Sequence, residues 1–262
     1  MTPYKFNVQE TTDALIDWIR DWFGKNGDNE TKALLGISGG KDSTVVAGLL
    51  VKALGKERVI GVLMPNGIQP DIEDSLAVVR HLGIKHYVIN INNAFNGITS
   101  EIGNALGTQE TTPQYKTNTP ARIRMTTLYG VAAQIGNCRI ANTCNRSEDV
   151  QGYSTHYGDS AGDFSPLSKL TTEEVVSIGD YIGLPLNLTH KVPSDGMCGK
   201  SDEDNLGWTY AEINRIIRRN EKGEHYEAIV NKYKWMKFKL EIVRIPAFMP
   251  GLPDYFAETF GI

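Results

Sequence analysis

Residues 33–54, ALLGISGGKDSTVVAGLLVKAL, carry the strongest structural signal in the chain. The apolar stretch from Ala33 to Ser38 runs into a glycine-rich turn. An amphipathic stretch then extends from about Ser43 to Leu54 and stops at Gly55. This order predicts a β-strand, a tight loop and an α-helix, the first unit of an α/β fold.

The same alternation continues along the chain. We expect an amphipathic first helix that begins near Thr11 and ends at Gly24, later strands followed by helices, and polar loops. Parallel strands joined by helices predict a doubly wound (Rossmann-like) α/β sheet of about five strands, flanked by helices, in one domain spanning residues 1–262. The expected strands are Val59–Met64, His86–Ile91 and Cys138–Thr143; the helices are Asp71–Leu82 and Ala121–Ile135; the loops are 103–119, Gln151–Asp163 and Ser194–Asn205.

Composition excludes several classes of protein. The chain has 262 residues, 40% of them hydrophobic and 22% charged, which is ordinary for a globular protein. A net charge of -4 argues against coating nucleic acid or a membrane surface. Cys138, Cys144 and Cys198 form no metal-binding spacing, and no signal peptide or membrane-spanning run is seen, so we expect a cytoplasmic protein.

The glycine turn has the chemistry of a phosphate site. Backbone N–H groups at a helix N-terminus favour an anion, and Gly39 and Gly40 let the backbone approach phosphate oxygens. The spacing fits neither a Walker A loop nor a GxGxxG fingerprint. Asp42 would repel a phosphate unless a cation stood between them, so the turn predicts nucleotide with Mg²⁺.

A simpler interpretation of this turn is structural. Asp42 and Ser43 could merely cap the helix that follows. The complete SGGKDS motif directly after a strand favours ligand binding over that alternative.

Five ordered motifs identify a family. SGGKDS resembles the pyrophosphate-binding loop of the N-type ATP pyrophosphatases. The segments that follow resemble ammonia-dependent NAD synthetases in the same order, and the resemblance covers nearly the whole chain. They are NTPARIRM (118–125), NRSEDVQGYSTHYGD (145–159), Pro193-Ser194 and SDEDNLG (201–207).

The resemblance implies a two-step ligase. ATP would adenylate the nicotinate carboxylate of deamido-NAD with release of pyrophosphate, and ammonia would then displace AMP to give NAD. It also implies a homodimer with the dinucleotide bound across the subunit interface, and helices such as Ala121–Ile135 could form that interface. No glutaminase domain is expected, so free ammonia or a partner would supply nitrogen.

The resemblance also assigns roles to residues. Asp42 and Glu148 would bind Mg²⁺, and Asp202, the second catalytic residue beside Asp42, would receive a proton from ammonium. The positions expected to contact ATP are Gly36, Ile37, Ser38, Gly39, Gly40, Lys41, Asp42, Ser43, Thr143 and Ser194. Those expected to contact deamido-NAD are Arg122, His156, Asp163, Tyr115 and Lys239.

Several positions depart from the family pattern. Thr172 replaces a lysine expected at ATP phosphate, for which Lys169 could substitute, and His156 replaces a common lysine. Gln114 stands where a phenylalanine often stacks on nicotinate, with Tyr115 adjacent. The C-terminal basic contact, Lys239, lies in an unusual tail.

Two other functions remain open at the level of sequence. The chain could be another adenylating amidotransferase or a tRNA-thiolating enzyme of the same loop class, although it lacks a CxxC pair and a basic field. It could also be a nucleotide sensor in which Asp42, Glu148 and Asp202 are inert. Pyrophosphate release separates the sensor from the enzymes.

Overall fold

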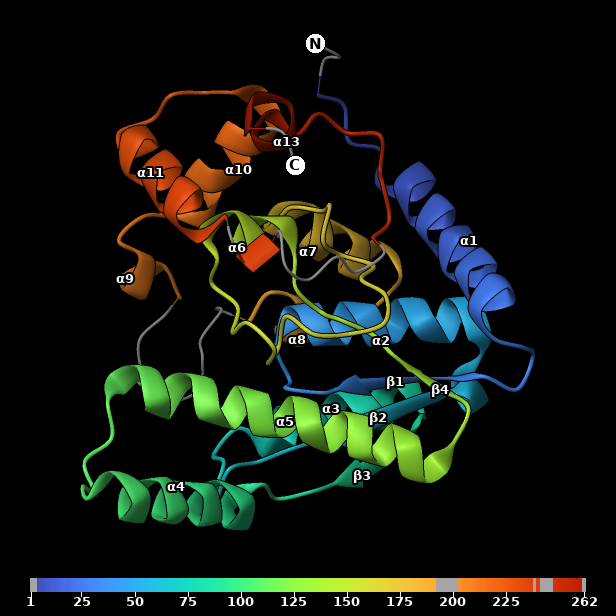
Figure 1. Cartoon of the computed structure of the whole chain (residues 1–262). Coiled ribbons are helices and arrows are strands. Elements are labelled where there is room, and N and C mark those ends of the chain that lie inside the picture. Colours follow the sequence, from blue (N-terminus) through green and yellow to red (C-terminus); the bar gives the residue numbers. More distant parts are fainter. Residues whose placement is uncertain (1–3, 192–201, 238, 241–246, 261–262) are drawn as a thin grey trace.

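A four-stranded parallel sheet lies at the centre of the molecule (Figure 1). The computed structural model describes residues 4–191, 202–237, 239–240 and 247–260. The strands are β1 (Lys32–Gly36), β2 (Val59–Leu63), β3 (Lys85–Val88) and β4 (Cys138–Ile140). Their order is β3-β2-β1-β4, so the chain winds outward from β1 in both directions. This confirms the doubly wound α/β fold.

The helices that surround the sheet have the following bounds. They are α1 (Val8–Asn26), α2 (Lys41–Leu54), α3 (Ile72–Leu82), α4 (Asn92–Leu106), α5 (Pro113–Ile135), α6 (Arg146–Gln151), α7 (Thr172–Tyr181), α8 (Leu186–Thr189), α9 (Asp202–Leu206), α10 (Tyr210–Arg219), α11 (Tyr226–Met236) and α13 (Tyr255–Phe260). A short 3₁₀ turn covers Lys56–Arg58. In the described ranges, none of these helices is both long and apolar enough to cross a bilayer.

Both faces of the sheet are covered by helices. Ala33 and Leu35 of β1 pack into one core with α1, α2, α3 and α7, while Leu34 packs into a second core with α5. This alternation is the two-residue period of a strand that is buried on both sides. In Figure 1 the two faces appear as α1 with α2 above the sheet and α5 with α4 below it.

A third apolar cluster joins the C-terminal helices to one another. Val150 of α6 packs with residues of α9, α10 and α11, among them Leu206, Ile213 and Ile229. In Figure 1 this cluster lies beyond α7, on the α2 side of the sheet. It brings the polar residues of α6, α9 and α10 close to the start of α2.

The structure differs from the sequence-based expectation at several boundaries. The described residues form four strands where about five were expected, and β4 ends at Ile140 instead of Thr143. Part of the expected loop 103–119 is helical, because α5 begins at Pro113 and continues through Pro120. The Thr112 side chain accepts a hydrogen bond from the Tyr115 N–H and Pro113 occupies the first turn, which is a strong helix start that the polar composition conceals.

Candidate active site

The loops that follow β1 and β4 meet at the carboxyl edge of the sheet. The strand order reverses between these two strands, and doubly wound folds bind ligands at that switch point. The Asn145 side chain, from the loop after β4, donates a hydrogen bond to Asp42 Oδ1 at 3.0 Å across 103 positions of sequence. The site is therefore assembled where the fold itself opens a crevice.

The turn between β1 and α2 is held by its own serines. Ser43 Oγ donates to the Gly40 carbonyl oxygen at 3.1 Å and lies 3.1 Å from Ser38 Oγ. Gly40 caps α2 without a side-chain hydrogen bond to the first turn. The first backbone N–H groups of α2 thus have no side-chain partner, which leaves them available to an anion.

Gly39 is required by this turn. Its φ of +78° lies in the left-handed region, and a Cβ placed there would stand 2.8 Å from the Ser75 backbone nitrogen. The start of α3 therefore forms the outer wall of the turn. A side chain at position 39 would need both a strained backbone and a shift of α3.

Lys41 is a buried cation among carboxylates. Its side chain is 4% exposed, and Nζ lies 2.7 Å from Asp42 Oδ2. Burial disfavours the charged ammonium, but the charges of Asp42 and Glu148 outweigh it and raise the pKa of Lys41. The ammonium therefore stays charged and offsets part of the negative charge at the start of α2.

Glu148 is placed by a capping box at the start of α6. The Asn145 side chain accepts from the Glu148 N–H at 3.2 Å, and Glu148 Oε2 accepts from the Asn145 N–H at 3.2 Å. Enclosure by protein atoms and the neighbouring charge of Asp42 raise the pKa of Glu148 well above its usual range. Two carboxylates held this close favour a bound cation.

These carboxylates suit Mg²⁺. One Asp42 oxygen faces Lys41 and the other faces Asn145, while Glu148 Oε1 accepts no hydrogen bond from the described residues. No cluster of three or more His, Cys, Asp and Glu side chains that could hold a metal occurs in the described part of the chain. One or two carboxylates with phosphate oxygens and waters is the usual set for Mg²⁺, so the pair fits.

Asp202 lies at the edge of the same cluster. Its side chain is 6% exposed, and Asp202 Oδ2 accepts from the Tyr210 hydroxyl at 3.4 Å. Tyr210 is itself buried, and burial together with the charges of Glu148 and Asp202 raises its pKa, which keeps the phenol protonated. The sequence singled out Asp202 but not Tyr210, since a tyrosine at a helix start carries no distinguishing pattern.

Three of the five residues expected to contact the dinucleotide lie together. Arg122 on α5 donates from Nε to the His156 carbonyl oxygen at 3.2 Å. Lys239 Nζ donates to the carbonyl oxygens of Gly152 and Ser154 at 2.7 and 2.9 Å. Partial burial and the charges of Lys239 and Arg122 lower the pKa of His156. A neutral imidazole beside two cations forms a surface suited to an anionic ligand.

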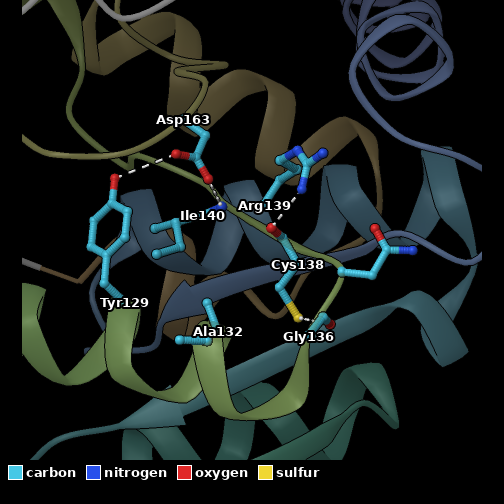
Figure 2. A pocket seen from close by; sticks show the side chains of 9 residues that line it. Tyr129, Ala132, Gly136, Cys138, Arg139, Ile140 and Asp163 are labelled. Atoms are coloured by element: carbon cyan, nitrogen blue, oxygen red, sulfur yellow. Dashed lines mark hydrogen bonds between the residues drawn. The ribbon is translucent and has the colours of Figure 1, made fainter.

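Tyr115 and Asp163 have other contacts. The Tyr115 hydroxyl lies 2.9 Å from Thr99 Oγ1 on α4, and its ring packs 6.1 Å from that of Phe95. Asp163 accepts from the Ile140 N–H at 2.7 Å and from the Tyr129 hydroxyl at 3.4 Å, as Figure 2 shows. Asp163 lines a surface hollow of about 470 Å³ between the C-terminal half of α5 and β4.

The remaining expected contacts are placed as follows. Gly36 and Ile37 join β1 to the turn, and Thr143 follows β4 at the carboxyl edge without a side-chain hydrogen bond to any described residue. Ser194 lies outside the described residues. Thr172 is buried, and its N–H donates to Ser147 Oγ at 3.1 Å.

The sequence is similar to known proteins over most of its length. The family model described as NAD synthase matches residues 11–244. The NH(3)-dependent NAD(+) synthetase of Carboxydothermus hydrogenoformans is 34% identical over 92% of this chain and 99% of its own length.

Solved structures show the same fold. The NMN synthetase of Francisella tularensis is 31% identical with a TM-score of 0.82, over 93% of this chain and 100% of that one. The NH3-dependent NAD synthetase of Campylobacter jejuni, solved with a nitrate ion, is 27% identical with a TM-score of 0.72, over 92% and 99%.

Proposed function

Since this chain belongs to the NAD synthase family, we propose that it is an ammonia-dependent NAD synthetase, a carbon–nitrogen ligase that uses ATP. The substrate carboxylate attacks the α-phosphorus of ATP, and pyrophosphate leaves. Ammonia then attacks the acyl carbon of the adenylate, and AMP leaves with the carboxylate oxygen. The products are NAD, AMP and pyrophosphate.

The turn between β1 and α2 is the observation that carries this proposal. The first N–H groups of α2 have no side-chain cap, and the buried Lys41 ammonium lies 2.7 Å from Asp42 and within the charge influence of Glu148. A departing pyrophosphate is stabilised by such preorganised donors. Mg²⁺, when bound by Asp42 and Glu148, supplies further positive charge for the phosphates.

Asp202 is the proposed acceptor for the proton of ammonium. Ammonium has no lone pair for attack and becomes a nucleophile only after losing a proton. The Asp202 carboxylate is almost fully buried and has the Tyr210 hydroxyl as a hydrogen-bond donor at 3.4 Å. A buried acceptor also limits the access of water, which would otherwise hydrolyse the adenylate.

A product assay tests the reaction. The chain is incubated with ATP, Mg²⁺, ammonium and deamido-NAD, and the amounts of NAD, AMP and pyrophosphate are compared. We expect equal amounts of the three. Orthophosphate in place of pyrophosphate, or turnover of ATP without deamido-NAD, would contradict the proposal.

The mononucleotide is a second candidate substrate. The solved structure with a TM-score of 0.82 to this chain is an NMN synthetase that it covers completely. By the same chemistry, NMN would form from the carboxylate of nicotinate mononucleotide. Competition between the mononucleotide and the dinucleotide in one reaction gives the ratio of kcat/KM directly and decides between them.

We also propose a homodimer formed through α4 and α5. Only Pro120 and Ile123 of the 23 residues of α5 are buried, and α4 exposes Ile102 and Leu106 by 40% and 72%. An exposed apolar face of this kind suits a second copy of the chain. Light scattering during gel filtration gives the mass, and a monomer at micromolar concentration would exclude this part of the proposal.

The nitrogen source and location belong to the same proposal. Free ammonia is the expected nitrogen donor, and a reaction with glutamine alone should give no amide.

The cytoplasmic location follows from the expectation that the cysteines stay reduced. Among the described residues, Cys138 and Cys144 are both free thiols.

A further inference from the structure

Arg124 on α5 is a half-buried arginine whose guanidinium has one hydrogen bond to the described residues. Its Nε donates to the Met64 carbonyl oxygen at 3.0 Å, and no described residue forms an ion pair with it. The buried Arg218 and Arg146 each have an ion-pair partner, since Arg218 binds Glu174 and Arg146 binds Asp254. Asp159 acts on Arg124 only through its charge, from beyond ion-pair distance, which leaves the guanidinium open to an anionic ligand.

The direction of the guanidinium is set by its one hydrogen bond. With Nε engaged by Met64, Nη1 and Nη2 remain without a partner in the described part of the chain. These two nitrogens form one edge of the planar group and can bind two oxygens of one anion side by side. Arg122, two positions earlier, instead donates to the carbonyl oxygen of His156, so the two arginines serve different places.

Met64 places this edge beside the phosphate turn. Gly36 of β1 pairs with Val62 of β2, and Met64 follows two residues later at the carboxyl edge. A Cβ at Gly36 would lie 3.2 Å from the Met64 side chain. The end of β2 therefore borders the start of the turn that is proposed to hold pyrophosphate.

We infer that Arg124 binds the α-phosphate of the nucleotide. In doubly wound folds the ligand lies across the carboxyl ends of neighbouring strands, so a nucleotide whose pyrophosphate occupies the turn after β1 would extend over the end of β2, where Met64 holds Arg124. The phosphate between the ribose and the pyrophosphate turn is the α-phosphate. Arg124 would then stabilise negative charge on the α-phosphoryl oxygens as the carboxylate attacks.

A ligand panel tests this inference, which rests on the proposed use of ATP. Binding of AMP, adenosine and pyrophosphate with Mg²⁺ is measured by calorimetry for the natural chain, Arg124→Ala and Arg124→Lys. Lys116→Ala is the matched control, because it removes an exposed cation from the same helix. The panel contains no carboxylate substrate. Its binding results therefore test the role of Arg124 even if the chain does not catalyse the proposed amidation.

The expected result is selective. Arg124→Ala should weaken AMP about tenfold or more while adenosine and pyrophosphate change by less than about twofold. Arg124→Lys should fall between, because it keeps the charge but loses the paired donors. Lys116→Ala should bind all three ligands as the natural chain does.

Two results would overturn the inference. One is an unchanged preference for AMP over adenosine in folded Arg124→Ala. The other is an equal loss for all three ligands, which would indicate a structural role. If Arg124→Ala unfolds, Arg124→Lys replaces it in the test. Thermal unfolding shows whether this variant is folded, and its affinity for AMP relative to adenosine decides whether the inference holds.

Discussion

Asp42 combines three contacts in one side chain. It faces Lys41 at 2.7 Å, accepts from Asn145 at 3.0 Å and raises the pKa of Glu148 by its charge. We therefore propose that the residue serves the reaction more than the core. Its removal should separate catalysis from stability.

Asp42→Asn should slow pyrophosphate release by about 10²-fold or more, because the cation that neutralises the phosphates loses a charged ligand. The free energy of unfolding should fall by less than in a variant that leaves a buried charge without any partner, since Lys41 keeps the charge of Glu148 nearby. Single-turnover pyrophosphate release and urea unfolding measure the two effects. Asp17→Asn, at a side chain that is 71% exposed, is the control. Near-normal release by Asp42→Asn would reject the metal-ligand role.

Single residues also show how far sequence reasoning reached. The SGGKDS turn follows from a motif whose chemistry is local, whereas the roles of Arg122, His156 and Lys239 are expected only from the family resemblance. The bond between Asn145 and Asp42 spans 103 positions, and Tyr210 meets Asp202 only through the packing of α10. Such contacts depend on the tertiary arrangement, which no spacing along the chain encodes.

At the scale of elements, the turn from β1 to α2 depends on its contact with α3. Gly39 has the left-handed φ of +78°, and Gly107 at the end of α4 has a similar φ of +68°, with no neighbour within 4 Å of the point where a Cβ would stand. A side chain at either position would therefore strain the backbone, but only a side chain at position 39 would also collide with α3. Alanine at each position isolates the contribution of α3.

Gly39→Ala should destabilise the chain by about 2 kcal/mol or more, because left-handed strain adds to overpacking against α3. Gly107→Ala should cost about 1 kcal/mol from strain alone. Urea unfolding of both variants gives the comparison. Equal losses would mean that α3 moves aside freely, and the turn would then be less rigid than we describe.

Helix α5 shows why element boundaries are harder to predict than elements. The expected start at Ala121 places the helix directly after Pro120, where a proline usually ends or begins one. The observed start at Pro113 relies on the Thr112 cap, and the helix then tolerates Pro120. Tertiary contacts outweigh local propensity here, because Pro120 and Ile123 are the buried residues of α5.

At the scale of the whole molecule, a buried ion pair ties four segments of the chain together. Arg218 of α10 donates to Glu174 of α7 at 2.7 Å and to the Pro253 carbonyl oxygen at 2.8 Å. The Tyr4 hydroxyl donates to the same Glu174 at 3.2 Å. Both ends of the described chain therefore contact one ion pair, Tyr4 through Glu174 and Pro253 through Arg218.

Arg218→Met should lower the free energy of unfolding by about 3–5 kcal/mol, because it leaves the charge of Glu174 buried without its partner. Arg219→Met is the matched control. The side chain of Arg219 is 54% exposed, so this substitution should lower the free energy of unfolding by less than about 0.5 kcal/mol. Denaturant unfolding at neutral pH measures both. A loss below about 1 kcal/mol for Arg218→Met would contradict this account of the ion pair.

Tyr4→Phe should show a pH dependence in the alkaline range. Burial and the charge of Glu174 raise the pKa of Tyr4 to about 12 in the folded chain. Below pH 10 the phenol is protonated in both states, and its hydrogen bond should stabilise the natural chain by about 1 kcal/mol. Between pH 10 and 12 only the unfolded state ionises, so this advantage should shrink.

The free energy of unfolding of the natural chain and of Tyr4→Phe is measured at pH 8, 10 and 11. Other titrating groups affect both chains alike, so the difference between the two values reports on Tyr4. A difference that stays constant across this range would mean that Tyr4 is not coupled to Glu174.

The closing stretch of the chain has a consequence for handling the protein. Arg146, which lies between the Asn145 cap and Glu148, donates to Asp254 at 3.1 Å, and Arg218 uses Pro253. Proteolytic cleavage before residue 253 would remove the hydrogen-bond acceptors of two guanidinium groups at once, Asp254 for Arg146 and the Pro253 carbonyl oxygen for Arg218. Damage more than a hundred positions downstream would thus reach Glu148, the proposed magnesium ligand, and preparations clipped there should lose nucleotide turnover while most of the sheet persists.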